Sequence, residues 1–427
     1  MKIAIVDHPE RSHVSFSKGG SVEIWIHEVA RRLAQSCEVV TYSTRDSRDS
    51  LPEEEWCEGV RYRRVFDWTE ELLCRFGKMK GAQLAERKLH DFHSGLYYIG
   101  YSLAVAKDLR RQGCDIIHII NLSQYAPIFR RFSPKTKIVL NMRAEWLTQL
   151  DRRLVEARLE KVDLVIGNSD YVTNKIRSAF PRFAGRCQTV WNGTDPDYFV
   201  PGKSRLESSD RPVKRLLFVG RISPEKGIHV LIDAMPLVLE RFPQAQLEIV
   251  GPIGQLPRNC IVDLDTDPEV QRLSSFYGGV EYHDQLKAQV RRLRLESHVH
   301  FHPGLPHPEV LSRYQTADLF VFPSISETFG VPVIEAMACG TPVVAGRAGG
   351  IPELVVSGKT GLLVERGNPR QLADAILKIL ADSCLARSMG EWGRKRVQDH
   401  FSWQNVVENL LSQYNGRPSG SASKRAL

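Results

Sequence analysis

Short apolar runs rich in β-branched residues alternate along the chain with longer amphipathic stretches. The apolar runs form two series, the first at residues 3–6, 39–42, 116–120, 137–140 and 164–166, and the second at 216–219, 247–250, 299–301, 319–322, 343–344 and 362–364. Helical patterns fill the intervals, for example at 22–35, 227–241, 371–381 and 385–400. Continuous apolar strands that alternate with helices are typical of parallel sheets covered on both faces. Because the pattern starts twice, we predict two doubly wound α/β domains.

The two domains are expected to join within residues 191–212, a stretch rich in Pro, Gly, Ser and Asp. A chain of 427 residues also exceeds the usual size of one hydrophobic core. We therefore place an N-terminal domain at 1–195, a C-terminal domain at 196–400 and a disordered tail at 415–427. Segment 252–285 interrupts the alternation and indicates an insertion of loops and short helices. Ligands of open α/β sheets bind at the carboxyl ends of the strands, so facing sheets would hold substrates in a cleft between the domains.

The composition is that of an ordinary globular protein and argues against a secreted or membrane-spanning chain. Hydrophobic residues make up 42% of the chain and charged residues 25%, which is ordinary for a globular protein. The N-terminus enters a strand directly, without the pattern of a signal peptide, and no apolar run is long enough to span a bilayer. Eight cysteines without CxxC or metal-like spacing indicate reduced thiols, so a cytoplasmic protein is expected.

The surplus of positive charge lies in the first part of the chain. Residues 1–190 contain 31 Lys and Arg against 24 Asp and Glu, whereas 191–427 contain 27 against 26. Such a surplus can draw the N-terminal domain to an acidic acceptor or, as a peripheral contact, to anionic lipid at the inner membrane face. Solvated helix faces explain the charge equally well, because acidic residues are interspersed. No nucleic-acid-binding motif accompanies the charge, so no nucleic-acid partner is expected.

Residues 324–340 carry the first candidate chemistry. A buried-strand pattern leads into a loop, and Pro332 suits the first position of the helix that follows. The amides of Phe329, Gly330 and Val331 would then be unsatisfied donors at the positive end of that helix. Such a helix start is a natural anion site, and a glycine there lets a phosphate come close.

Two glutamates flank this helix start. Glu335 falls in the first turn, where its carboxylate could accept hydrogen bonds from the vicinal hydroxyls of a ribose. Glu327 lies in the loop and could bond the hydroxyls of a transferred sugar. Taken alone, Glu335 would be read as a partner of the helix dipole and Glu327 as a solvated loop residue. The whole string favours the functional interpretation.

A second string follows the first strand of the second series. The strand ends at Gly220, and Arg221 and Lys226 lie on the turn after it. A nucleotide diphosphate gains negative charge as its sugar departs, so two fixed cations would stabilise the transition state more than the ground state. The alternative is a surface salt bridge of either cation with Glu225, which would contribute little to stability.

These strings resemble the donor site of the large retaining glycosyltransferase family 4 (glycosyl transferases group 1). The resemblance rests on Gly220-Arg221, on Lys226-Gly227 and on the pair Glu327 and Glu335, and it extends to residues 340–353, 192–195 and 18–20. It spans nearly the whole chain, and the C-terminal half matches most closely.

The resemblance implies a GT-B fold, in which two Rossmann-like domains hold the donor in the C-terminal domain and the acceptor mainly in the N-terminal one. It implies a hexosyl or related transfer, with retention, from a nucleotide-diphosphate sugar to a hydroxyl of a lipid-linked, polysaccharide or small-molecule acceptor. Neither a metal nor a further cofactor is expected. A last helix near 401–414 would cross back to the first domain. The resemblance implies as donor-binding residues Gly19, Gly20, Arg221, Lys226, Leu305, Glu327, Phe329, Gly330, Val331 and Glu335, and as catalytic residues Arg221, Lys226, Glu327 and His118.

The N-terminal half departs from the family pattern at two strand ends. Relatives place an H-x-H pattern after the fourth strand, whereas here only His118 is present. Relatives often have His-Asp at the next strand end, where this chain has Asn-Met-Arg-Ala-Glu-Trp at 141–146. His118 is explained equally well as a hydrogen-bonded residue at a strand end. Arg143 is expected to contact acceptor or donor phosphate, and Glu145 to bond the sugar or accept a proton.

Other functions remain open. A non-catalytic nucleotide-sugar-binding protein would explain the altered strand ends, whereas a nucleotide-sugar epimerase would need paired acid–base carboxylates that are not recognisable. A phosphorylase-like enzyme would need a longer chain and a lysine-bound cofactor, and the lack of GxGxxG after the first strand argues against a nicotinamide enzyme. The histidines at 298, 300, 302 and 307 are better explained by a loop near the nucleotide base than by a metal site. The donor base, the donor sugar and the acceptor are not fixed by the sequence.

Overall fold

The computed structural model describes residues 1–8, 20–45, 52–66, 97–202 and 213–416. The chain divides into two compact units. The first comprises Met1–Trp191 and Val406–Leu427, and the second comprises Asn192–Asn405. The boundary after Trp191 falls at the start of the linker predicted from composition. Most of the tail predicted to be disordered lies outside the described residues.

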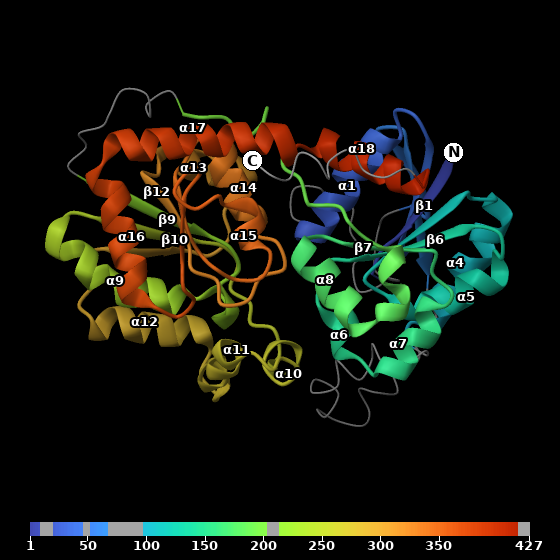
Figure 1. Ribbon diagram of the computed structural model, residues 1–427, viewed down its shortest axis with the longest axis horizontal. Coiled ribbons are helices and arrows are strands. Elements are labelled where there is room, and N and C mark those ends of the chain that lie inside the picture. Colours follow the sequence, from blue (N-terminus) through green and yellow to red (C-terminus); the bar gives the residue numbers. More distant parts are fainter. Residues whose placement is uncertain (9–19, 46–51, 67–96, 203–212, 417–427) are drawn as a thin grey trace. The chain divides into compact units, whose positions relative to one another are not determined.

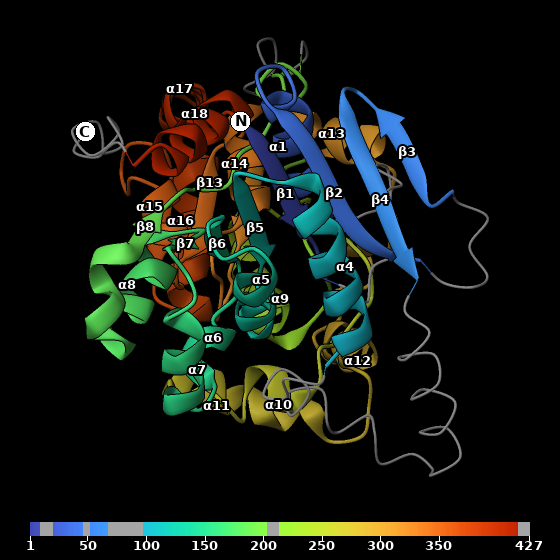
Figure 2. The same ribbon diagram turned by 90° about the vertical axis from the view of Figure 1, so that its right-hand side faces the viewer.

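The first unit is built on an eight-stranded sheet with the order β3-β4-β2-β1-β5-β6-β7-β8. Its strands are β1 (Lys2–Val6), β2 (Glu38–Arg45), β3 (Glu54–Cys57), β4 (Val60–Phe66), β5 (Ile116–Ile120), β6 (Lys137–Met142), β7 (Leu164–Gly167) and β8 (Cys187–Thr189). All neighbours are parallel except β3 and β4, which form an antiparallel hairpin at the sheet edge (Figure 2). The described helices of this unit are α1 (Ser21–Leu33), α4 (Ile99–Gln112), α5 (Ala126–Phe132), α6 (Trp146–Gln149), α7 (Arg152–Leu159) and α8 (Asp170–Ala179).

The second unit is built on a six-stranded parallel sheet with the order β11-β10-β9-β12-β13-β14. Its strands are β9 (Arg215–Val219), β10 (Gln246–Val250), β11 (Val299–His302), β12 (Leu319–Phe322), β13 (Val343–Gly346) and β14 (Leu362–Val364). Its helices are α9 (Ile228–Arg241), α10 (Arg258–Ile261), α11 (Pro268–Arg272), α12 (Tyr282–Arg292), α13 (His307–Thr316), α14 (Val331–Ala338), α15 (Ile351–Leu354), α16 (Pro369–Ala381) and α17 (Ser383–His400). Helices α9, α12 and α16 cover one face of this sheet, and α13, α14 and α17 cover the other (Figure 1).

Both sheets therefore confirm the predicted fold class of doubly wound α/β domains. The central strands are almost fully buried because helices cover both faces, which explains their continuous apolar runs: β5 and β12, for example, are buried at every position. In the second sheet the strand order reverses between β9 and β12, which are hydrogen-bonded neighbours. The carboxyl ends of strands at such a reversal are the usual ligand site of this architecture.

The last helix, α18 (Trp403–Tyr414), contains the second boundary between the units. Its first turn is bonded within the second unit, where the amide of Trp403 donates to the carbonyl of Thr194. Its end belongs to the first unit, where the ammonium of Lys137 donates to the last carbonyls of the helix. Among the described residues, no helix is both long and apolar enough to cross a bilayer.

Candidate functional site

Two loops at the centre of the second sheet carry most of the predicted donor residues. The loop after β9 presents Arg221 and Lys226, and the loop after β12 presents Glu327. Because β9 and β12 are neighbours where the strand order reverses, both loops begin side by side at the carboxyl edge of the sheet. The structure thus brings together residues that lie about a hundred positions apart in the chain.

Backbone contacts lock these two loops together. Gly227 has a φ of +67°, and a Cβ at this position would lie 2.2 Å from the carbonyl oxygen of Pro323. The carbonyl of Glu225 accepts hydrogen bonds from the amides of Ile325 at 2.8 Å and Ser326 at 3.2 Å. Glycine is therefore needed where the cationic loop crosses the end of β12, and the two loops have one fixed arrangement.

Arg221 is held by a buried carboxylate. Its Nη2 donates to Oε1 of Glu225 at 2.6 Å, and its Nε donates to the hydroxyl of Ser223 at 3.2 Å. Burial raises the pKa of Glu225, but Lys226, Arg221 and the hydrogen bond from Ser223 outweigh it, so the pKa lies below its usual value. The pair is not the surface salt bridge considered as an alternative, because Glu225 is only 3% exposed.

Lys226 and Glu327 form a second ion pair, which joins the two loops. The ammonium of Lys226 lies 2.7 Å from Oε2 of Glu327, and the side chains are 17% and 13% exposed. The other oxygen of Glu327, Oε1, accepts from the amides of Thr328 at 3.1 Å and Phe329 at 3.4 Å. All polar atoms of the Glu327 side chain are therefore engaged.

The predicted anion site lies at the N-terminus of α14, where the structure places the start of a helix as expected. Gly330 is its N-cap residue with a φ of +103°, and Pro332 follows in the first turn. Within the described part of the chain, the amides of Gly330 and Val331 donate to no acceptor. The ring of Phe329, a predicted donor-binding residue, is buried, so only the backbone amide of this residue could contact a bound anion. Free amides at the positive end of a helix attract an anion.

Glu335 lies in α14 beside a tyrosine that sequence reasoning did not identify. The hydroxyl of Tyr314, on α13, donates to Oε2 of Glu335 at 2.8 Å. Burial raises the pKa of Glu335 from 4.5 to about 7, although the hydrogen bond from Tyr314 lowers it. The ring of Tyr314 is fully buried, so it fixes the direction of this carboxylate. No local pattern links the two residues, because they lie on different helices.

Three other predicted donor residues do not belong to these two loops. Gly20 is the N-cap residue of α1 in the first unit and has an extended backbone, while Gly19 lies outside the described residues. Leu305 is half-buried in the loop between β11 and α13. The nearby histidines at the start of β11 have separate partners, since His298 bonds the carbonyl of Ala245 and His300 bonds Gln246. Across the described residues, no group of three or more His, Cys, Asp or Glu is placed to hold a metal ion.

His118 is part of the core of the first unit. It is 0% exposed, its Nδ1 lies 2.6 Å from the hydroxyl of Tyr414, and its Nε2 lies 3.0 Å from the amide nitrogen of Asn141. Burial, together with the charge of Arg143, lowers the pKa of His118 to about 3, so the ring is neutral. A neutral ring that accepts from Asn141 carries its proton on Nδ1 and donates it to Tyr414. Both ring nitrogens are thus engaged: Nδ1 attaches the last helix, and Nε2 bonds the neighbouring strand β6.

The two residues predicted on the acceptor side lie after β6. The guanidinium carbon of Arg143 lies 4.6 Å from the centroid of the Trp25 ring, and burial lowers the pKa of Arg143 to about 9 against the opposing charge of Asp7. Glu145 pairs with Lys175, and its side chain is 8% exposed. Arg143 and Glu145 therefore lie in one loop but have different partners.

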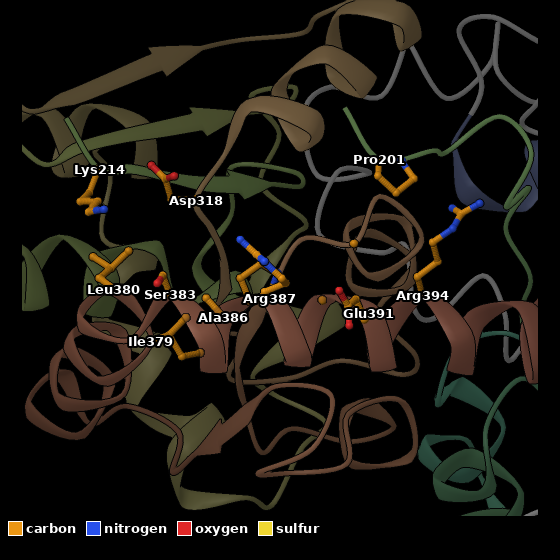
Figure 3. A pocket seen from close by; sticks show the side chains of 13 residues that line it. Pro201, Lys214, Asp318, Ile379, Leu380, Ser383, Ala386, Arg387, Glu391 and Arg394 are labelled. Atoms are coloured by element: carbon orange, nitrogen blue, oxygen red, sulfur yellow. The ribbon is translucent and has the colours of Figure 1, made fainter. Parts of the chain in front are cut away.

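A separate pocket of about 180 Å³ lies at the opposite edge of the second sheet (Figure 3). Lys214, Asp318 and Pro342, each directly before a strand, line one side of it, and Arg387 and Glu391 of α17 line the other. None of the predicted site residues contributes to this pocket. The donor residues and this pocket are therefore at different ends of the strands.

Family models match two consecutive parts of the chain. Residues 19–198 match the model described as Glycosyltransferase Family 4, and residues 205–396 match the one described as Glycosyl transferases group 1. The chain belongs to glycosyltransferase family 4. Two of its relatives match over nearly the whole length of the chain. The spore coat protein SA of Bacillus subtilis is 26% identical over 97% of this chain and 99% of its own, and a D-inositol 3-phosphate glycosyltransferase of Corynebacterium urealyticum is 27% identical over 94% and 91%.

Solved structures show the same fold. The sucrose-phosphate synthase of Thermosynechococcus elongatus superposes with a TM-score of 0.70 at 24% identity over 97% of this chain and 98% of its own. The Anabaena protein HepE in complex with UDP and glucose superposes with a TM-score of 0.68 at 20% identity over 97% and 99%. The family 4 chain is thus a glycosyltransferase with the GT-B fold, as the resemblance implied.

Proposed function

We propose that this glycosyltransferase moves a sugar from a nucleotide-diphosphate donor, with retention of the anomeric configuration, to a hydroxyl of a lipid-linked, polysaccharide or small-molecule acceptor. The observation that supports this most strongly is the convergence of Arg221, Lys226 and the free amides of α14 at the point where the second sheet reverses its strand order. An arginine fork, a compact ammonium and two backbone amides suit the oxygens of one diphosphate.

The chemistry asked of these groups is electrostatic. As the bond between the sugar and the diphosphate breaks, negative charge grows on the leaving group, and fixed positive groups stabilise that charge more than they stabilise the ground state. The departing diphosphate accepts the proton of the acceptor hydroxyl. Because Arg221, Lys226 and the amides of Gly330 and Val331 supply the positive charge, we propose that transfer needs no metal ion and no further cofactor.

The two glutamates bind the remaining parts of the donor, namely the ribose and the transferred sugar. Glu335, directed by Tyr314, accepts hydrogen bonds from the ribose hydroxyls, and Glu327 accepts them from the transferred sugar. Leu305 contacts the base. UDP is the first nucleotide to test, because the neighbouring fold of HepE was solved with UDP and glucose.

His118 is not part of the proposed catalytic set, because a fully buried ring with both nitrogens engaged cannot exchange a proton with a substrate. We propose Arg143 and Glu145 as acceptor-side residues. The surplus of Lys and Arg in residues 1–190 supports an anionic acceptor or a peripheral contact with anionic lipid at the inner membrane face.

A binding and transfer experiment tests the proposal. UDP-, GDP-, ADP- and dTDP-sugars are titrated into the full chain by calorimetry, and the sugar that binds is then supplied in radiolabelled form with candidate acceptors. We expect one nucleotide class to bind and the label to move only when an acceptor hydroxyl is present, with the product anomer read by NMR. Isomerisation of the donor sugar without an acceptor would show an epimerase, binding without transfer a binding protein, and no binding would refute the proposal.

A further inference from the structure

The carboxylate of Glu327 occupies one part of the proposed phosphate site, namely Lys226 and the loop amides just before the start of α14. One oxygen lies 2.7 Å from the ammonium of Lys226. The other oxygen accepts from the amides of Thr328 and Phe329, which directly precede the helix start. A single anionic group therefore bridges a cation from one loop and backbone amides from the other. This set of donors is what a phosphate oxygen pair would need.

The arrangement is held by the surrounding fold. The carbonyl of Glu327 accepts from the amide of Gly350 at 3.2 Å, which anchors the backbone of this residue. Lys226 is fixed from the other side, because the carbonyl of Glu225 docks its loop onto the loop of Glu327. The two charged side chains are only 17% and 13% exposed, so solvent screens their interaction weakly.

The other cation of the site is held differently. Arg221 is fixed by Glu225, whose side chain is 4% exposed and whose Oε1 also accepts from Ser223. In the described chain the Nη1 of Arg221 donates to no acceptor, so it can bind a phosphate while the pair with Glu225 remains. Lys226 has no separate anchor of this kind, because the carboxylate that holds its ammonium is the same one that takes the loop amides.

We propose that the Glu327 carboxylate is a built-in placeholder for a donor phosphate, which the incoming diphosphate displaces from Lys226 and the loop amides, and which then accepts hydrogen bonds from the transferred sugar. This inference rests on the proposed function and adds a consequence to it. A nucleotide sugar provides the displaced carboxylate with new partners, whereas a free nucleoside diphosphate does not. The exchange therefore favours the donor over the product that remains after transfer.

Calorimetric titration of UDP, GDP, ADP and dTDP into the full-length wild type and into Glu327→Gln tests this inference. The neutral amide binds Lys226 less strongly than the carboxylate does, so displacement becomes easier. We expect the variant to bind the nucleoside diphosphate roughly tenfold more tightly than the wild type, which is the size expected from one charge-assisted contact. We also expect the preference for the nucleotide sugar over the free diphosphate to decrease and the transfer rate to fall.

Glu365→Gln is the matched control, because Glu365 pairs with Arg347 at the surface and is 66% exposed. It should leave nucleotide affinity unchanged. Glu327→Ala, whose side chain is too short to reach Lys226, is a second variant, and circular dichroism verifies that both are folded. Equal or weaker binding of the diphosphate by folded Glu327→Gln and Glu327→Ala would overturn the placeholder while leaving the donor site in place. Absence of nucleotide binding by the wild type would instead overturn the proposed function itself, and the placeholder with it.

Discussion

Replacing Glu335 by glutamine is expected to stabilise the protein near pH 8 and to impair its use of the donor. The reason is that burial raises the pKa of this carboxyl from 4.5 to about 7, with the hydroxyl of Tyr314 as an opposing hydrogen-bond donor. The folded protein therefore prefers the protonated form, while the unfolded chain ionises at lower pH. Glutamine keeps the shape and removes the charge.

The magnitude follows from the shift. A pKa raised from 4.5 to about 7 corresponds to about 3 kcal/mol of stability lost once the group is ionised in both the folded and the unfolded state. Because Glu335 retains some solvent exposure, and because the new amide group leaves its N–H bonds unpaired, we expect a net gain of about 1–2 kcal/mol. For domains of this size the melting temperature should then rise by about 2–8 °C.

The stability gained by Glu335→Gln depends on pH. Below pH 4.5 the carboxyl is protonated in both states, so the variant gains nothing from this source. The gain should grow as the pH rises from 4.5 to about 7 and remain constant above that value. Thermal melts at pH 5, 6, 7 and 8 measure it, with Glu365→Gln as the exposed control. A difference in melting temperature that does not change with pH, or a variant that loses stability toward pH 8, would refute this reasoning. Donor kinetics should show a higher KM for Glu335→Gln.

Three further substitutions test other parts of the structure. Gly227→Ala should destabilise the second unit by about 2–4 kcal/mol in urea unfolding, because its Cβ would meet the carbonyl oxygen of Pro323, whereas Gly358→Ala, with a φ of +87° and nothing within 4 Å, should cost less. Tyr414→Phe should lower the free energy of unfolding by about 1–3 kcal/mol, because it leaves the buried Nδ1 of His118 without its partner, and kcat should not change. A large loss of kcat at retained stability would instead indicate a catalytic role for His118. Arg221→Lys should lower kcat/KM for the donor roughly tenfold or more in a variant that is still folded by circular dichroism, because lysine lacks the guanidinium fork, and wild-type kinetics would contradict this.

The hydrophobic pattern predicts those elements that are buried on both faces. The runs at 116–120 and 319–322 match β5 and β12 residue for residue, because helices cover both sides of these strands. The hairpin of β3 and β4 is not predicted. Arginines interrupt the apolar positions of β4 and pair with Glu54 and Glu55 of the edge strand, so the pattern there resembles that of a solvated loop.

The sequence predicts those residues of the candidate site that belong to short local motifs. Arg221, Lys226 and Glu327 follow strand ends that the pattern locates, and parallel topology places those ends together. The pairings within the site could not be predicted, because they depend on loop docking. Glu225 is buried by the contact of its own backbone with the loop after β12, and Tyr314 reaches Glu335 from another helix. The sequence shows neither.

The transfer rate of Lys226→Ala, measured with saturating acceptor and the donor identified by calorimetry, tests whether this lysine stabilises the departing diphosphate. Lys226 lies where the two loops meet, and we propose that its ammonium is the compact charge beside the departing diphosphate. We predict a loss of kcat/KM for the donor of roughly a hundredfold or more, with an unchanged fold by circular dichroism. Transfer by the folded variant at a rate near that of the wild type would show that the departing diphosphate does not depend on Lys226.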